Sequence, residues 1–426
     1  MSSSYTHMTM ATRIFLDGPE YVERTQTEFH PPDIDMQALK DAIPKIAFQR
    51  STPKSLLYTS PIFTVSAVLF FLSRFIDSAY LSDGLDRYPP FILLLIRWTF
   101  WLSYWALQGI AWAGLWTIGH ECDHNNLSPH SGVNHVIGFL CHTWLFLPYF
   151  SWRITHLRHH SYTGSLENDE VYVPYTRSAY RLPPLGKTRR AQYREAFEES
   201  PIFELSRLVI MQFFGMHTYL TCNTTGSKRY PAGANHWIPS SGLFSPEQRS
   251  QVLASNLGIL GMLAFVWVWA CYSSFSEVCK VYIVPFLFAN HWIVAMTFLQ
   301  HSCPTVPFYR KEAWNKARGS LSTIDRPFLG WVGLIFFLGL NHYHTTHHLF
   351  STIPFYNLPM AHKAIRPLLG DMYNYDSTGV FWALKRSFTE CIFVEDEGSV
   401  LFYKNKLGMH KRSMVIGTAG GQAQSS

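Results

Sequence analysis

The stretch FILLLIRWTFWLSYWALQGIAWAGLWTIGHECDH, residues 91–124, joins the two features that decide the fold of this chain. Its first part, Phe91 to Trp116, is almost entirely apolar, and a helix needs about 20 such residues to cross a bilayer. Its last part holds His120 and His124. Two histidines four residues apart emerge from one face of a helix, where they can share a metal ion. The stretch therefore predicts a membrane helix that leads into a metal site.

Two further histidine clusters have the pattern H-x-x-H-H. They are His156-Leu-Arg-His159-His160 and His344-Thr-Thr-His347-His348. With 20 histidines in 426 residues, one such pattern is expected by chance about 0.04 times, so two copies are about a one-in-a-thousand event. Neutral imidazole is the commonest metal-binding side chain. The three clusters, called boxes one, two and three below, are therefore predicted to converge on one metal site.

The composition is that of a membrane protein with substantial polar parts. Only 15% of the residues are charged and 47% are hydrophobic, whereas soluble domains are about 25% charged. Four stretches are long enough to span a bilayer: 56–75, 91–116, 252–272 and 281–299. Two shorter stretches, 136–150 and 329–340, suit interfacial or re-entrant helices.

Loop charge predicts the orientation of these spans. The connection 76–90 carries Asp77, Asp83 and Asp86 with a single Arg87, whereas the segment after box two is rich in arginine. Basic loops stay on the cytosolic side. With four crossings, both termini and all three boxes are then expected on the cytosolic side. The polar ends, 1–37 and 408–426, are predicted to be flexible.

A ninth candidate ligand, His301, directly follows the last apolar stretch. Nine neutral ligands exceed what one metal takes, which predicts two metal ions. Iron is favoured over copper or zinc because a redox-capable site facing cytosolic electron donors can activate O2. The predicted ligands are His120, His124, His156, His159, His160, His301, His344, His347 and His348.

Three other polar residues near the boxes are expected to support the ligands. Glu121 and Asp123 flank the histidine face of box one, so they are placed to hydrogen-bond imidazoles rather than to bind metal. His342 lies two residues before His344 and about 200° away around a helix. We expect His342 to act behind the ligands or not at all.

Competing functions find less support in the sequence. The motifs G-x-S-x-G, Walker A and G-x-G-x-x-G are absent, and no nucleic-acid signature is present. The seven cysteines are scattered without a C-x-x-C pair, which argues against a disulfide framework or a zinc ribbon. A non-catalytic metal-binding transporter or sensor is the alternative class. The position of the boxes outside the spans disfavours it.

Several further runs carry a resemblance to a known family. They are DAIPKIAFQRSTPKSLLY from Asp41, NTTGSKRYPAGANHWIPSSGLFS from Asn223, LQH ending at His301, GSLSTIDRP from Gly319, HHLFSTIPFYNLPMAHKAIRPLLG from His347 and FYKNK from Phe402. With the boxes, they make residues 38–407 similar to the membrane fatty acyl desaturases, and within these to the delta-12 oleate desaturases of plants and fungi.

The resemblance implies a fold and an activity. The fold is an all-α integral membrane protein of the endoplasmic reticulum, with four transmembrane helices and a cytosolic helical cap that holds a histidine-bound di-iron site. The activity is O2-dependent introduction of a double bond into a long acyl chain of a membrane lipid, 18 carbons at the delta-12 position. Electrons come from cytochrome b5 and its NADH-dependent reductase. The chain lacks the H-P-G-G haem signature, so cytochrome b5 is expected to be a separate protein.

The chain departs from the family pattern near the metals. Asp123 stands where the family usually has glycine, Leu338 where it has histidine and His342 where it has an acid, and Met216-His217 replaces Gly-Trp. An acetylenase, conjugase or hydroxylase acting on an unsaturated chain therefore stays as an alternative. Candidate docking surfaces for an acidic electron donor are the segment 177–194 and the cluster Arg310, Lys311, Lys316 and Arg318, although both also suit cytosolic anchoring.

Overall fold

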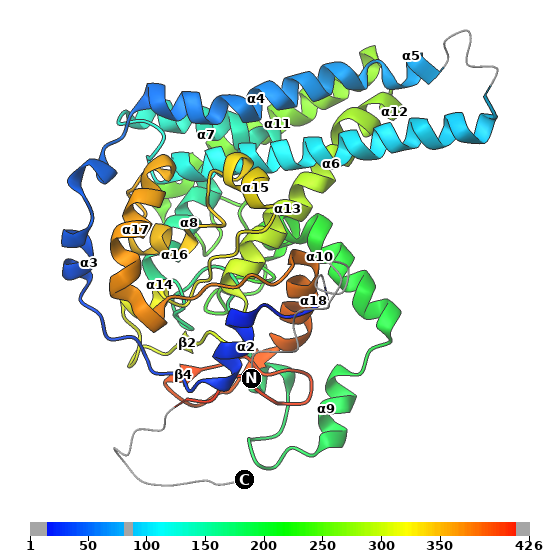
Figure 1. Cartoon of the computed structure of the whole chain (residues 1–426). Coiled ribbons are helices and arrows are strands. Elements are labelled where there is room, and N and C mark those ends of the chain that lie inside the picture. The colour runs from blue at the N-terminus through cyan, green and yellow to red at the C-terminus, as the bar shows by residue number, and fades with distance from the viewer. Residues whose placement is uncertain (1–14, 81–87, 415–426) are drawn as a thin grey trace, which may run out of the picture.

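The computed structural model describes residues 15–80 and 88–414, and helices dominate it (Figure 1). Asp83, Asp86 and Arg87, which contribute to the predicted orientation, lie outside the described residues. Four helical stretches are long and apolar enough to cross a membrane: Thr52–Ser78, Pro90–Asp123, Pro246–Tyr272 and Phe275–His301. Each contains one of the four predicted spans, so the predicted helical membrane fold is confirmed.

Two of the membrane helices continue beyond their apolar residues to reach candidate histidine ligands. Helix α6 continues without a break from the membrane stretch through His120, and α13 ends at His301. Two of the four spans thus deliver candidate ligands directly. The span elements are α4 (Thr52–Ser73), α5 (Ile76–Tyr80), α6 (Pro90–Asp123), α11 (Arg249–Tyr272), α12 (Phe275–Val278), the π-helical turn η4 (Cys279–Ile283) and α13 (Val284–His301).

Helix α6 is the central element of the span region. It packs against both α4 and α13, and its second half, from Gln108 to Asp123, is largely buried. Figure 1 shows the long helices α4, α6 and α11 extending together to one side, while α13 descends between the remaining elements. Helices α4 and α11 present exposed leucines and phenylalanines along their outer faces, as lipid-facing helices do.

At the end of the spans that lies far from the histidine boxes, polar side chains form hydrogen bonds with one another and with backbone carbonyl oxygens. Asp77 accepts hydrogen bonds from Arg97 Nε at 2.8 Å and from Trp101 Nε1 at 3.0 Å. Tyr104 and Trp105 donate to the carbonyl oxygens of Val281 and Lys280, both at 2.8 Å. These carbonyls belong to the π-helical turn, whose backbone pairing is irregular. The side chains of α6 therefore connect α5 and the π-helical turn η4 through hydrogen bonds.

The remaining elements form a cap at the other end of the spans, made mainly of residues 124–245 and 302–414. Figure 1 shows this cap below and beside the spans. Its helices are α7 (Ser131–Trp144), α8 (Tyr149–Tyr162), α9 (Arg190–Phe197), α10 (Pro201–Cys222), α14 (Lys316–Ser320), α15 (Gly330–Phe336), α16 (His344–Leu349), α17 (Leu358–Leu369) and α18 (Val380–Glu390). The predicted short stretches 136–150 and 329–340 contain most of α7 and all of α15, and neither helix is long enough to span a bilayer.

Four strands of two residues each tie the C-terminal part of the chain into the cap. They are β1 (Tyr175–Thr176), β2 (Phe308–Tyr309), β3 (Phe393–Val394) and β4 (Val400–Leu401). Strand β1 pairs in parallel with β3, and β2 pairs antiparallel with β4. The two small sheets join segments more than ninety residues apart, so the cap closes on itself through its last strands.

Residues 19–26 form helix α2 (Pro19–Gln26) within the segment predicted to be flexible. Tyr21 and Arg24 of this helix are buried, and Arg24 lies 3.8 Å from the carboxylate of Asp376. Buried ionic and aromatic contacts therefore hold α2 on the cap, which a local reading of its polar sequence misses. Helix α3 (Met36–Ala42) follows. The domain boundaries drawn at residues 37 and 408 stay predictions.

Helix α10 lies along α13 and forms one wall of the space beside the metal-binding region. Ser200 caps its N-terminus by accepting from Phe203 N, and Asn223 ends it with a φ of 50°. Ile202, Val209 and Phe214 are exposed on its outer face. The helix thus exposes apolar side chains, but it is not among the four helical stretches long and apolar enough to cross a membrane.

Candidate metal centre

Four elements bring the nine candidate ligands together. Box one closes α6, box two lies within α8, box three forms most of α16, and His301 is the last residue of α13. Eight of the nine side chains are buried and His301 is partly buried. All three boxes and the ninth histidine thus converge, as their spacing predicts.

One set of five histidines gathers around the end of α6. The nearest ring nitrogens of His120, His124, His156 and His160 all lie within 4.8 Å of one another. The Nε2 atoms of His124 and His156 face each other at 3.1 Å. The ring of His347 lies 4.8 Å, centroid to centroid, from the rings of both His120 and His124.

A second set of four histidines gathers around the end of α13. The nearest ring nitrogens of His159, His301 and His348 lie within 4.8 Å of one another. His344 joins them, because its Nε2 lies 3.0 Å from Nε2 of His301. The two sets meet where the rings of His160 and His348 stack at 4.1 Å and 12°. Both sets contain histidines whose ring nitrogens are close enough together to hold a metal ion.

The donor chemistry of this cluster fits transition metal ions. Within the described residues, neither ring nitrogen of His160 or His347 has a hydrogen-bond partner. Burial and the neighbouring imidazole of His120 lower the pKa of His347 to about 3, and burial holds the pKa of His160 well below its usual range. Both rings are therefore neutral near pH 7 and present bare nitrogen atoms, which metal ligands must do.

Two polar side chains determine which ring nitrogens of His159 and His348 are free to bind a metal ion. His159 Nδ1 donates to Asp169 Oδ1 at 2.6 Å, which leaves Nε2 as its free nitrogen. Thr163 donates to the carbonyl oxygen of His159, so its hydroxyl oxygen accepts from His348 Nδ1 at 3.0 Å. Such contacts set the ring orientation and tautomer of metal-binding histidines.

Asp169 and Thr163 were not predicted from the sequence. The polar run that follows box two, Gly164 to Glu170, is the only local signal for Asp169. Asp325 was also missed. It accepts a hydrogen bond from the backbone nitrogen of Thr345 at 2.8 Å and so anchors α16, which carries box three.

Box one is held from behind by a close helix contact. A Cβ atom at Gly119 would lie 2.1 Å from the ring of His142, so only glycine lets α7 approach α6 here. His142 Nε2 donates to the carbonyl oxygen of Trp116 at 3.2 Å. Trp116 and Trp152 stack on His120 and His156, respectively, at 5.5 Å and 4.2 Å. The first set therefore rests on a packed aromatic support.

The acidic residues of box one lie in different positions. Glu121 places a carboxylate oxygen within 4.8 Å of ring nitrogens of His120 and His347, so it is close enough to join the first set. It also lies 3.5 Å from His120 Nδ1, the contact expected of a supporting residue. Asp123 is fully buried, and its carboxylate interacts with the side chains of Tyr149 and Arg153.

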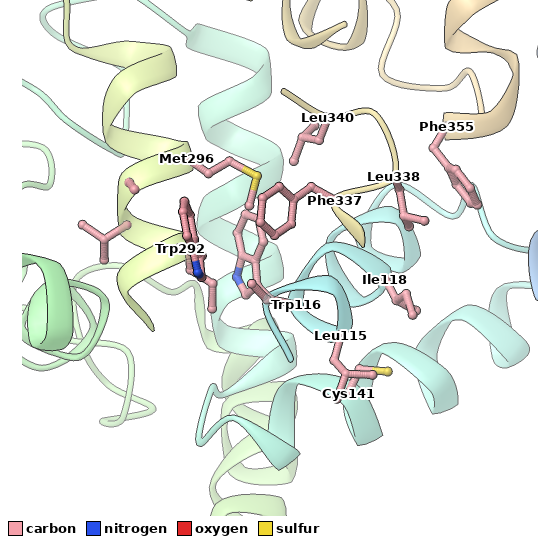
Figure 2. Close-up of a cluster of buried hydrophobic side chains, with 14 of the residues drawn as sticks. Leu115, Trp116, Ile118, Cys141, Trp292, Met296, Phe337, Leu338, Leu340 and Phe355 are labelled. Carbon is pink, nitrogen blue, oxygen red and sulfur yellow. The ribbon is translucent and has the colours of Figure 1, made fainter. Parts of the chain in front are cut away.

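The unusual residues before box three lie apart from the two sets. Figure 2 shows Leu338 in the apolar cluster with Phe355 and Ile118, while Phe337 points toward Met296. Leu338 adopts a φ of 50°, which non-glycine residues rarely do. His342 makes a ring contact with Tyr343 at 6.1 Å and belongs to none of the metal-capable groups found among the described residues.

A narrow apolar cavity of about 80 Å³ opens beside the histidines. It runs between α10 and α13, and its lining includes Trp116, Met216, Val294, Phe298, His301 and His344. Figure 2 shows Trp116 and Leu340 in the packed core that borders it. The cavity is smaller than the 300 to 1,000 Å³ of common ligand pockets. Its lining is mostly apolar, and six of the nine histidines contribute to it.

Comparison with known proteins agrees with this site. The sequence profile of the family described as fatty acid desaturase matches residues 97–379. The chain is 37% identical to the delta(12) fatty acid desaturase of Mortierella alpina, over 89% of this chain and 92% of that one. It is 34% identical to the delta(12)-fatty-acid desaturase of Arabidopsis thaliana, over 88% and 93%. It is also 34% identical to an oleate hydroxylase of Claviceps purpurea, over 91% and 84%. The chain belongs to the fatty acid desaturase family.

Proposed function

We propose that this protein is an O2-dependent acyl-lipid desaturase that introduces a double bond at the delta-12 position of an 18-carbon chain. The observation that carries the proposal is the apolar cavity that borders six of the nine converging histidines. Both delta(12) desaturase relatives named above cover about nine-tenths of the chain. The imidazole-rich donor set suits iron as well as copper or zinc, and two iron ions are proposed because O2 activation needs a redox-active metal.

The proposed ligands divide as the two sets do. His120, His124, His156, His160 and His347 would hold one iron, and His159, His301, His344 and His348 the other. The bound irons supply the redox chemistry that activates O2. Overall, a –CH2–CH2– unit loses two hydrogens, O2 takes these with two electrons and two protons, and the products are –CH=CH– and two water molecules.

The protein's own residues orient the chain and exclude water. Val294, Phe298 and Met216 present apolar surface along the cavity, so an alkyl chain replaces no hydrogen-bonded water there. Asp169 and Thr163 hold the imidazoles of the second set at the cavity end. A fixed chain beside fixed ligands meets the requirement for orientation in a reaction of unactivated carbon atoms.

The first test expresses the chain in a host whose own lipids are only monounsaturated and profiles the fatty acids. The expected result is a new diunsaturated 18-carbon chain with its second double bond at delta-12. The proposal would be overturned if the host contains iron-loaded protein and its lipids still hold no chains other than monounsaturated ones. A hydroxylated product would instead favour the second candidate, an oleate hydroxylase, which the 34% identity to such an enzyme supports.

The second test addresses the ligands through the neighbouring pair His342 and His344. His344 Nε2 faces His301, whereas His342 lies outside both sets. His344→Ala should lower the iron content of the purified protein, and His342→Asp should leave it unchanged. Loss of iron in both variants would contradict the assignment, as would two full iron equivalents in His344→Ala.

The third test addresses the electron donor. We propose that a separate cytochrome b5 with its NADH-dependent reductase supplies electrons at the cytosolic face of the endoplasmic reticulum. Lys311 of the cap, which is exposed, supports a docking role for an acidic partner, whereas the neighbouring Arg310 pairs with Glu167. Turnover in lipid should require cytochrome b5 and fall with added salt. Full turnover without cytochrome b5 would contradict the dependence.

A further inference from the structure

Tyr172 stands out on the cavity wall because its backbone is strained. Its φ is 55°, in the left-handed region that disfavours side chains with a Cβ. Such strain persists where the surroundings impose it, commonly at functional sites. Tyr172 lines the cavity together with Thr297 and His301. The strained backbone and the place in the cavity lining together indicate a functional role for the ring of Tyr172.

The surroundings of Tyr172 fix the turn on which it lies. The Asp169 carboxylate that binds His159 also accepts from the backbone nitrogens of Glu170 and Val171, at 2.7 Å and 3.3 Å. The carbonyl oxygen of Tyr172 accepts from the hydroxyl of Tyr403 at 3.3 Å. One carboxylate thus links a predicted metal ligand to the turn that presents Tyr172.

The ring of Tyr172 lies against the last turn of α13. It is nearly parallel to the ring of His301, at 13° and 6.2 Å between centroids, and lies 5.7 Å from the ring of Phe298. Its hydroxyl donates to Thr297 Oγ1 at 2.8 Å, and Thr297 donates in turn to the carbonyl oxygen of Ile293 at 2.8 Å. Both hydroxyl protons are used within the wall. The ring therefore presents a fixed surface without a free donor to the cavity.

We propose that Tyr172 is a specificity-determining residue, whose ring sets which carbon atoms of the acyl chain stop beside the metal centre. The inference rests on the proposed desaturase function and adds to it the side chain that selects the position of oxidation. Tyr172 and His301 both line this cavity of about 80 Å³, with their rings 6.2 Å apart between centroids. Removing the ring would let the chain shift along its own axis.

The matched variants are Tyr172→Phe and Tyr172→Gly. Phenylalanine keeps the ring, and Thr297 keeps its bond to Ile293 without the hydroxyl. Glycine removes the ring and accepts a φ of 55° without strain, so the turn keeps its shape. Tyr175→Gly, three residues further and half-exposed in β1, controls for loss of a tyrosine in the same segment.

Each variant is expressed with the wild type in the same host, and two quantities are measured: iron per chain and the position of each new double bond, located by mass spectrometry. Tyr172→Phe and Tyr175→Gly should keep the wild-type positions. Tyr172→Gly should keep its iron and give a several-fold larger share of shifted double bonds or hydroxylated chains.

The outcomes separate this inference from the function on which it rests. If iron-loaded wild type makes no new double bond, the proposed function fails. If Tyr172→Gly holds iron and makes only the wild-type product at a lower rate, the specificity role is overturned while the function stands. Loss of iron from Tyr172→Gly would also overturn it, because Tyr172 would then support the metal centre itself.

Discussion

Asp169 shows how one buried carboxylate organises several parts of the site. It accepts from His159 Nδ1 at 2.6 Å and from the backbone nitrogen of Gly164 at 2.8 Å, in addition to the turn that follows. Asp169→Asn removes the negative charge and one acceptor oxygen. Loss of such a supporting contact typically weakens metal binding by about 10- to 100-fold. Iron retention against a competing chelator should fall accordingly.

The control for Asp169→Asn is Glu167→Gln, two residues earlier. Glu167 pairs with Arg310 at 3.1 Å on the surface and touches no imidazole in the described contacts. Its substitution should leave iron retention unchanged. Equal retention in both variants would show that the Asp169 contact does not stabilise the centre.

Gly119 tests the helix contact behind box one. Its missing Cβ would lie 2.1 Å from the ring of His142, and a packed imidazole cannot move aside as a flexible side chain does. Gly119→Ala should therefore destabilise the protein by about 1–3 kcal/mol, as overpacking does. Thermal unfolding in detergent measures this effect. Gly132→Ala in α7, where nothing lies within 4 Å, is the matched control and should not lower the melting temperature.

Among the elements, α2 depends on a charge cluster centred on Asp376. This buried carboxylate binds Arg326 Nη1 at 2.6 Å, lies 3.8 Å from Arg24 and also pairs with Arg386. Burial alone would raise the pKa of Asp376, but Arg326 and Arg386 outweigh it and hold the pKa well below its usual range. A carboxylate with a depressed folded-state pKa stabilises the fold above its unfolded pKa of about 3.9.

The stabilising effect of Asp376 should therefore be present at neutral pH and decrease as the pH falls below about 4. Asp376→Asn removes it at every pH and leaves Arg24 and Arg326 without a carboxylate partner, while Arg386 keeps Asp17, at a cost of about 3–5 kcal/mol. Helix α2 should then loosen, and limited proteolysis near residues 19–26 should accelerate at pH 7. Asp371→Asn, an exposed residue close by, should not change the cleavage rate. Equal rates in both variants would show that Asp376 does not hold α2.

The sequence predicts elements well where the signal is local. Spans such as 91–116 are encoded by apolar length, and the boxes by histidine spacing, so both appear without tertiary information. The order of α2 depends instead on Arg24 meeting Asp376, more than three hundred residues away. Asp169 reaches His159 only because the chain turns back after α8. Contacts of this kind have no periodic signature and need the fold.

For the whole molecule, the metal centre is the point where membrane and cap are joined. Helices α6 and α13 arrive from the spans, while α8 and α16 belong to the cap, and all four end or lie at the same cluster of imidazoles. Metal bound to all four elements would resist their separation.

Removing the metal should therefore lower the stability of the whole protein and not only its activity. A ligand that binds only the folded state stabilises it by about 2.7 kcal/mol at a free concentration one hundred times its Kd. The melting temperature in detergent should fall after treatment with a chelator and recover when ferrous iron is returned. His342→Asp should show the same iron-dependent shift, whereas His344→Ala should show a smaller one, because only His344 faces His301. A melting temperature indifferent to the chelator would mean that packing alone holds the four elements together, and the two sets of histidines would then contribute nothing to joining the cap to the spans.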